Sequence, residues 1–372
     1  RPEGKLATRI SRNLRFGLFH MLNLYSNATK FIILEDDLIV APDFYGFMQQ
    51  TGVVMDQDKS VYCVSGFNHL SYAHTAKDPA QVYRIEFGPS YGWMTSREVL
   101  HDVLPKWLPS NITHDWDHVI SSPVIRQGRE CLVPDINRSY HGGIMGHHAS
   151  ASYRFEKNYL NRTINKLPYV KIMDTSKLLK ESYESEMVSL FKKATSVKIE
   201  DIDNFTLPFS ETGVYVICVK KSYDEDSINF RIVGEALNVW NKDARESHHH
   251  TWRLHYNNAT LLVVGVPSSK YFSVAPKDCP VLKTSTPKEA EDELEKEDAH
   301  AREDMPIFVH RIFPYITDGG RRISLFSKDI FYIDTTNREV NSSTTLLSTE
   351  TKPVLSNNNT SLNLASTTRP TQ

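Results

Sequence analysis

The segment FIILEDDLIVAPDFYGF, residues 31–47, decides the fold that we expect for this chain. Residues 31–34 form a short apolar run, which predicts a strand that is buried on both faces of a mostly parallel sheet. Pro42 then opens a helix whose aromatic residues share one face. The three acidic residues at positions 35–37 therefore follow a strand, at the sheet edge where open α/β folds bind their ligands.

Composition excludes several classes of function. The chain has 372 residues, of which 40% are hydrophobic, and this is enough for a core in two or three folding units. Its formal net charge of −2 gives no general attraction to nucleic acid or to an anionic membrane. No window holds the roughly 18 consecutive apolar residues of a membrane span, and no signal-peptide pattern opens the sequence. We therefore expect a globular protein that does not bind nucleic acid and that meets a membrane only through a segment absent from this sequence.

The remaining pattern indicates an α/β fold. Helices are expected at 11–26, 176–193 and 227–240, and further strands at 60–65, 82–87, 213–219 and 260–266. These elements predict a first domain at 1–165, a smaller α/β unit at 166–282, a charged linker at 283–334 and a disordered Ser/Thr/Asn-rich tail at 335–372.

Taken alone, the acidic triplet has more than one interpretation. Three neighbouring carboxylates repel one another unless a cation or a set of donors neutralises them. A hard ion such as Mn²⁺ or Mg²⁺ would do so, with a diphosphate as the source of its other ligands. The alternative is an acidic turn that caps the following helix. A metal-dependent phosphohydrolase would use a similar edge, but EDDLI lacks the nucleophilic aspartate pattern of such enzymes.

Cysteine spacing and glycosylation acceptors indicate the compartment. The four cysteines show no zinc-finger spacing, which argues against a structural zinc site. Asn-X-Ser/Thr acceptors recur within the folded region, at Asn27, Asn111, Asn137, Asn161, Asn204 and Asn258. Such a set favours the lumen of the secretory pathway, where disulfides persist.

Several longer motifs decide between these interpretations. They are FIILEDDLIVAPDFYGF, VYCVSGFN, YAHTAKDPAQVYRIE, PSYGWM, HDWDHVISSPVIRQGREC, PDINRSYHGGIMG, TWRL and LLVVGVPSS, in this order over about residues 10–275. In these motifs the chain resembles the inverting N-acetylglucosaminyltransferases of glycosyltransferase family 13. Within this family, YAHTAKDP and RQGREC are most similar to the members that act on protein O-linked mannose, and the members that initiate complex N-glycans are more distant.

The resemblance implies a GT-A type sheet, incomplete at its N-terminus, with a smaller C-terminal α/β unit. The implied reaction transfers GlcNAc from UDP-GlcNAc to the 2-hydroxyl of an α-mannose on a glycoprotein, with inversion. The resemblance also implies that Asp37 binds Mn²⁺ or Mg²⁺, that Asp36 contacts the ribose and that Glu35 contacts the donor sugar. The metal would offset the charge that develops on the UDP leaving group.

Inversion by a single displacement also needs a general base for the acceptor hydroxyl. The resemblance implies that Asp117 in HDWDHV has this role and that Trp116 lies beside the sugar. Asp115 is the alternative, because it shares a face with Asp117 if the segment is extended. The DWD stretch could also be a helix cap with a buried tryptophan.

Further positions follow from the same resemblance. It implies a disulfide between Cys63 and Cys131, for which free buried thiols are the alternative. It places Tyr91 where relatives carry a smaller apolar residue near the acetyl group of the donor. It also makes residues 141–152 a loop that closes over the diphosphate.

Two polar clusters are expected to have no role in the chemistry. Arg126 and Arg129 are expected to form structural ion pairs with Glu130 and Asp135 rather than to clamp a phosphate. The run at 248–250, three consecutive histidines, is expected to be a solvated loop, because consecutive side chains point in different directions.

Two classes of function are left open by the sequence. The first is an N-acetylglucosaminyltransferase that uses UDP-GlcNAc and a mannosylated glycoprotein; the resemblance implies a type II membrane protein of the Golgi lumen. The second is a non-catalytic glycan-binding or scaffold protein that lacks the nucleotide-binding half of the fold. The intact triplet at 35–37 and Asp117 favour the enzyme, because sequence drift in a non-catalytic protein would have removed at least one of them. The absent nucleotide-binding half favours the second class.

Overall fold

The computed structural model describes residues 6–107, 115–142, 161–172, 174–203, 210, 212–223, 226–285, 288 and 290. All of them belong to one unit, Arg1–Val340, and a second unit, Asn341–Gln372, lies outside them. The predicted linker at 283–334 lies outside the described residues except for 283–285, 288 and 290, and the predicted tail lies wholly outside them.

A five-stranded sheet forms the first part of the fold. Its order is β1 (Lys30–Ile33), β5 (Trp93–Ser96), β3 (Val61–Ser65), β6 (Glu130–Pro134) and β4 (Val82–Ile85). Only β3 and β6 run parallel among these neighbours, and the other three pairs are antiparallel. The expected α/β class is confirmed, but the expectation of a mostly parallel sheet was wrong.

Strand β1 also differs from the prediction. It lies at the edge of the described sheet, pairs antiparallel with β5, and of its four residues only Phe31 is buried. A short apolar run has no periodicity that separates a central strand from an edge strand lying under helices, and this is why the prediction failed.

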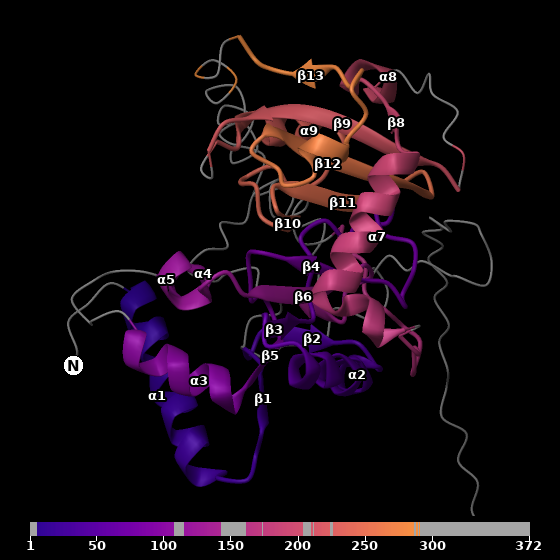
Figure 1. The fold of residues 1–372 in the computed structure, drawn as a ribbon. Coiled ribbons are helices and arrows are strands. Elements are labelled where there is room, and N and C mark those ends of the chain that lie inside the picture. The colour runs from indigo at the N-terminus through magenta and orange to yellow at the C-terminus, as the bar shows by residue number, and fades with distance from the viewer. Residues whose placement is uncertain are drawn as a thin grey trace, which may run out of the picture. The chain divides into compact units, whose positions relative to one another are not determined.

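Helices cover both faces of this sheet. Helices α1 (Leu6–Leu24), α3 (Arg97–Val103) and α4 (Trp116–Ser121) share a hydrophobic core with one face, and α2 (Phe44–Gln57) packs on the other, as Figure 1 shows. The residues of β3 divide between the two cores: Tyr62 faces the first group, and Val61 and Val64 face α2, with a register irregularity between Val61 and Cys63. The short elements η1 (Leu104–Lys106) and α5 (Pro123–Arg126) follow α3 and α4.

A two-stranded ribbon leaves this sheet directly after the acidic triplet. Strand β2 (Leu38–Val40) pairs antiparallel with β7 (Ser139–His141), with Leu38 opposite His141. The pairing brings the end of the motif PDINRSYH beside the acidic turn.

A second sheet contains the C-terminal strands. Its order is β10 (Ser247–His248), β11 (Thr251–Tyr256), β12 (Ala259–Pro267), β9 (Val214–Lys221) and β13 (Val281–Leu282), and β8 (Thr195–Ser196) also pairs with β9. Helices α7 (Lys180–Lys193) and α9 (Ile228–Ala236) contribute to two separate cores on this sheet. The remaining short elements are η3 (Thr175–Leu178), α8 (Ile199–Asp203) and η4 (Phe272–Val274). The predicted helices at 176–193 and 227–240 thus appear as α7 and α9.

The two sheets are tied together by buried polar contacts. The backbone N–H of Glu86, just after β4, donates to the carbonyl of Ser247 in β10 at 2.8 Å. The ring Nδ1 of His69 lies 2.5 Å from Glu246 Oε1, and both side chains are almost fully buried. These contacts hold the hairpin of β10 and β11 against the first sheet.

Candidate active site

The acidic triplet forms the turn between β1 and β2. The turn is closed by the backbone N–H of Leu38, which donates to the carbonyl of Glu35 at 3.4 Å. Glu35 is half-buried, Asp36 is exposed, and 29% of the Asp37 side chain is exposed. The carboxylates therefore lie at a surface that solvent or a ligand can reach, as the sequence predicted.

Strand β7 places a histidine against this turn. His141 Nε2 lies 3.4 Å from Asp37 Oδ2, and the backbone N–H of Gly142 donates to the carbonyl of Asp37 at 2.8 Å. The sequence placed His141 only at the start of the predicted loop 141–152, whose residues 143–152 lie outside the described residues. The pairing of β2 with β7 could not be predicted from the local sequence pattern, because the two strands are far apart in the chain.

Helix α4 brings the second half of the predicted site to the same place. Trp116 stacks on Trp93, with ring centroids 5.8 Å apart and planes at 12°. The indole N–H of Trp116 donates to the side chain of Glu35, and the charge of Asp117 also acts on Glu35. The acidic turn and α4, about 80 residues apart in the chain, therefore border one site.

The neighbours of Glu35 in this arrangement shift its pKa. The pKa of Glu35 is raised, first because burial disfavours the charged form and then because Asp37 lies nearby with the same charge. His141 and the Trp116 hydrogen bond oppose the shift, and Asp117 adds to it. The site thus gathers like charges that a bound cation would neutralise.

Asp115 and Asp117 are both close to the site. Asp115 is the extended residue before α4 and Asp117 lies in the first turn, and their carboxylates and a ring nitrogen of His118 lie within 4.8 Å of one another. The backbone N–H of His118 donates to Asp117 Oδ1 at 2.9 Å, which fixes the orientation of that carboxylate. The geometry brings together both predicted candidates for the base.

Tyr91 packs beside His141. Its ring centroid is 4.6 Å from that of His141 and 4.9 Å from that of Phe67. The charge of Arg245 acts on both Tyr91 and Asp117. Arg245 is itself held by a two-point ion pair with Asp243, whose shorter contact is 2.6 Å.

Arg245 is a site residue that sequence reasoning missed. Burial lowers the pKa of the Arg245 guanidinium, but the neighbouring Asp243 outweighs burial, and the net shift is upward, so the group is a permanent cation. In the sequence it stands between Asp243 and Glu246, where an arginine is indistinguishable from one in an ordinary surface ion pair.

The disulfide prediction is confirmed in this structure, and a second bridge was not predicted. Cys63 and Cys131, which are register partners in β3 and β6, form one disulfide. Cys218 and Cys279 form the other, and it joins β9 to the segment before β13.

Two polar predictions need correction. Arg126 and Arg129 do form structural ion pairs, but with Glu86 at 3.7 Å and Asp102 at 2.7 Å, not with the predicted partners Glu130 and Asp135. The run at 248–250 is not a solvated loop, because β10 ends there in a tight turn that packs against the first sheet.

The residues of the acidic turn fit a hard divalent cation. Carboxylate oxygens are the preferred ligands of Mn²⁺ and Mg²⁺, and a cation beside Asp37 would offset the repulsion that raises the pKa of Glu35. Among the described residues, the groups of three or more potential ligands within 4.8 Å do not include Asp37. An ion there would take further ligands from a bound phosphate, which is how Mg²⁺ commonly binds nucleotides.

Comparison with known proteins identifies the family. The model of the GNT-I family matches residues 5–246, which contain the acidic turn, α4 and Arg245. The chain belongs to the GNT-I family. A plant relative from this comparison is the alpha-1,3-mannosyl-glycoprotein 2-beta-N-acetylglucosaminyltransferase of Arabidopsis thaliana, which is 28% identical over 198 residues.

This match covers 52% of the chain and 42% of the plant protein, so it spans less than half the length of that relative. Among the described helices, none is both long and apolar enough to cross a membrane.

Proposed function

We propose that this GNT-I family member transfers GlcNAc from UDP-GlcNAc to the 2-hydroxyl of a mannose on a glycoprotein, with inversion and with a divalent metal. The strongest support is that residues of the acidic turn and of α4 lie around Glu35. The charges of Asp37 and Asp117 raise its pKa, and Trp116 donates a hydrogen bond to it. A donor-binding edge and a base candidate on one site are what an inverting displacement needs.

The acidic turn would hold the donor. Asp37 would bind Mn²⁺ or Mg²⁺, Asp36 the ribose and Glu35 the sugar. The bound metal would stabilise the negative charge of the departing diphosphate. Glu35 is suited to hydrogen bonding with a sugar hydroxyl, because its half-buried carboxylate lies beside Asp37 and can accept hydrogen bonds.

Helix α4 would activate the acceptor. The Asp117 carboxylate would accept the proton of the mannose 2-hydroxyl as its oxygen attacks the anomeric carbon from the face opposite UDP. Trp116, stacked on Trp93, would be a flat apolar wall for the sugar. We assign the role of general base to Asp117 rather than Asp115, because the charge of Asp117 contributes to the pKa shifts of Glu35 and Arg245 in the site.

The rest of the site would set specificity. Tyr91 would lie near the acetyl group of GlcNAc, and Arg245 would place a positive charge close to Asp117. The motifs resemble those of enzymes of O-linked mannose, but they do not choose between an O-mannosylated peptide and the mannose arm of an N-glycan. The family resemblance favours a GT-A type fold in the Golgi lumen.

A transfer assay with labelled UDP-GlcNAc and Mn²⁺ tests the proposal, with an O-mannosylated peptide and an N-glycan mannose arm as parallel acceptors. Asp117→Asn should lower kcat by about 10²- to 10⁴-fold with little change in donor binding. Asp37→Ala should abolish both transfer and metal-dependent donor binding, whereas Asp56→Asn, a change to an exposed carboxylate on α2, is the matched control.

The outcomes separate the candidate functions. Transfer by the parent and loss in the two site variants would support the enzyme and the residue roles. Transfer that survives Asp117→Asn would exclude Asp117 as the base. Binding of mannosides by the parent without any transfer would instead support the glycan-binding alternative.

A further inference from the structure

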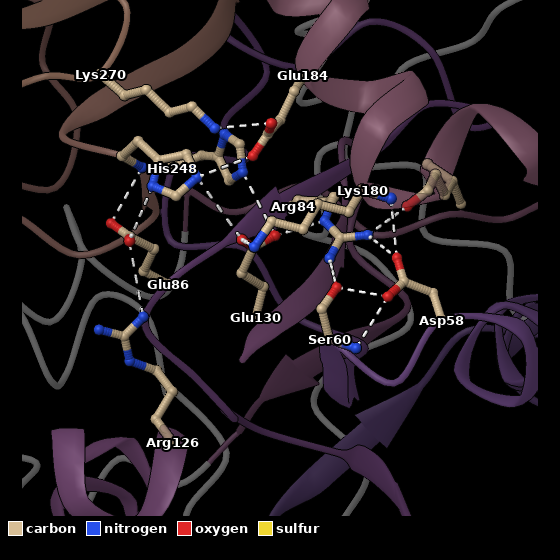
Figure 2. Close-up of polar contacts among 12 residues, drawn as sticks. Asp58, Ser60, Arg84, Glu86, Arg126, Glu130, Lys180, Glu184, His248 and Lys270 are labelled. Atoms are coloured by element: carbon tan, nitrogen blue, oxygen red, sulfur yellow. Dashed lines mark hydrogen bonds and ion pairs between the residues drawn. The ribbon is translucent and has the colours of Figure 1, made fainter. Parts of the chain in front are cut away.

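A cluster of histidine and glutamate side chains lies outside the candidate active site, between the first sheet and the hairpin of β10 and β11. Glu130 begins β6, His248 ends β10, and His249 follows in the turn. The side chains of Glu130 and His248 are only 1% and 3% exposed. Figure 2 shows Glu130 paired with His248, with the carboxylates of Glu86 and Glu184, which contact His249, close by.

Two buried atoms in this cluster lack the hydrogen bonds that buried polar atoms normally make. Glu130 Oε1 and His248 Nε2 are inaccessible to solvent, and the described residues offer them ion-pair contacts but no well-aligned hydrogen bond. His248 Nε2 lies 3.4 Å from Glu130 Oε2 without hydrogen-bond geometry, and His249 Nε2 lies 3.8 Å from Glu130 Oε1. These atoms face one another as ligands face a shared ion.

The spacing of these atoms suits a tetrahedral metal. Zinc bonds of about 2.1 Å to nitrogen and oxygen place neighbouring ligand atoms about 3.4 Å apart at the corners of a tetrahedron. Ligand atoms of Glu130, His248 and His249 all lie within 4.8 Å of one another. Glu184 Oε1 lies 3.3 Å from His249 Nε2 but is not among these mutually close atoms, so its side chain would have to rotate to take the fourth corner.

Each of the three central side chains is oriented by an outer partner. His248 Nδ1 lies 3.1 Å from the hydroxyl of Tyr271, and His249 Nδ1 lies 3.3 Å from Glu86 Oε1. Glu130 Oε2 accepts a hydrogen bond from Arg84 Nε at 2.5 Å. Partners of this kind fix the ring tautomer of a metal-binding histidine, with Nε2 left to bind the ion.

The local backbone supports a role beyond folding. His249 and His250 are the two loop residues between β10 and β11, and their φ angles are 49° and 58°. Two-residue hairpin loops with positive φ at both positions strongly prefer Asn-Gly, so a His-His pair is locally unfavourable there. Strained residues of this kind concentrate at sites that hold ligands.

We propose that Glu130, His248 and His249, with Glu184 as the fourth ligand, bind a zinc ion that ties the hairpin to the first sheet. Two imidazoles with carboxylates suit zinc better than Mg²⁺ or Mn²⁺, which prefer oxygen ligands alone. Lys180 Nζ lies 3.8 Å from Glu130 Oε1 and is the cation that zinc must displace; its side chain is 41% exposed and can turn to solvent. This zinc site does not depend on the proposed transferase activity.

Zinc titration of the full chain by equilibrium dialysis tests the site, in an Asp37→Ala background that removes the proposed active-site ligand. One zinc per chain is expected. His249→Gln should weaken zinc binding by more than about 100-fold, since loss of an outer partner alone costs 10- to 100-fold. The matched control is His255→Gln, because His255 is also part-buried and paired with a carboxylate, Asp135, at 3.1 Å. Lys180→Gln should tighten binding.

A second measurement needs no variant in the cluster. Zinc should protect His249 from acylation by diethyl pyrocarbonate, as read by peptide mass spectrometry, whereas the exposed His101 should react equally with and without zinc. Cobalt substitution should give the visible absorption of a four-coordinate ion. Absence of bound zinc, equal losses in His249→Gln and His255→Gln, or unprotected His249 would each overturn the proposal.

Discussion

The disulfide between Cys218 and Cys279 offers a stability prediction whose size follows from the chain. The bridge closes a loop of 61 residues, which contains α9 and strands β11 and β12 of the second sheet. The loss of chain entropy on closing such a loop corresponds to about 4.3 kcal/mol at 25 °C. The Cys63–Cys131 bridge, with a separation of 68, gives about 4.4 kcal/mol by the same relation.

Replacement of both cysteines of either pair by alanine should therefore lower the free energy of unfolding by a similar amount, about 4 kcal/mol. Urea unfolding followed by circular dichroism measures this, with the midpoint shift interpreted through an unchanged slope. The two loops do not overlap in the chain, so the two losses should add. A loss under about 1 kcal/mol for either pair would refute an origin in the entropy of the unfolded chain.

Three further predictions concern buried or exposed polar groups. Asp43→Asn removes the nearest counter-charge of the fully buried Arg138, which lies 3.0 Å away, and should cost about 3–5 kcal/mol in urea unfolding. The pKa of Glu35 is raised in the folded protein, so the free energy of unfolding should fall as pH rises from the unfolded pKa of 4.5 through the folded pKa. Glu35→Gln should remove this fall in the free energy of unfolding in metal-free buffer. In secretory expression, mass spectrometry should find a glycan on the exposed turn residue Asn258 and none on the fully buried Asn137.

Each of these predictions has a control or a contradicting outcome. Asp56→Asn should cost less than about 1 kcal/mol, because its ion pair is largely exposed; an equal cost for Asp43→Asn would contradict the role of burial. Glu98→Gln, at an exposed position of α3, is the control for removal of a carboxylate. If Glu35→Gln left the pH profile of stability unchanged, Glu35 would have no raised pKa. A glycan on the buried asparagine would contradict its burial.

The sequence placed the two halves of the candidate site but not the residues that join them. Glu35 and Asp117 were found through motifs, and the structure brings them to one place. His141 and Arg245 reach the site through pairing of β2 with β7 and packing of the second sheet, and such long-range contacts leave no local pattern.

The errors also have physical causes. The apolar run at 31–34 suited a central parallel strand, but it forms an edge strand in which only Phe31 is buried, because so short a run has no periodicity that separates the two. The sequence did not predict the hairpin of β10 and β11, because its tight turn contains His249 and His250 instead of the usual Asn-Gly. The pairing of Cys218 with Cys279 could not be deduced, because spacing alone does not determine connectivity.

The central claim is that the acidic turn and α4 act on one bound nucleotide sugar. A crystal structure of the full chain with UDP-GlcNAc and Mn²⁺, with anomalous scattering to locate the metal, tests it most directly. The account predicts manganese against Asp37 and the sugar between that ion and Asp117. Manganese elsewhere, or Asp37 and Asp117 opening onto separate cavities, would contradict it.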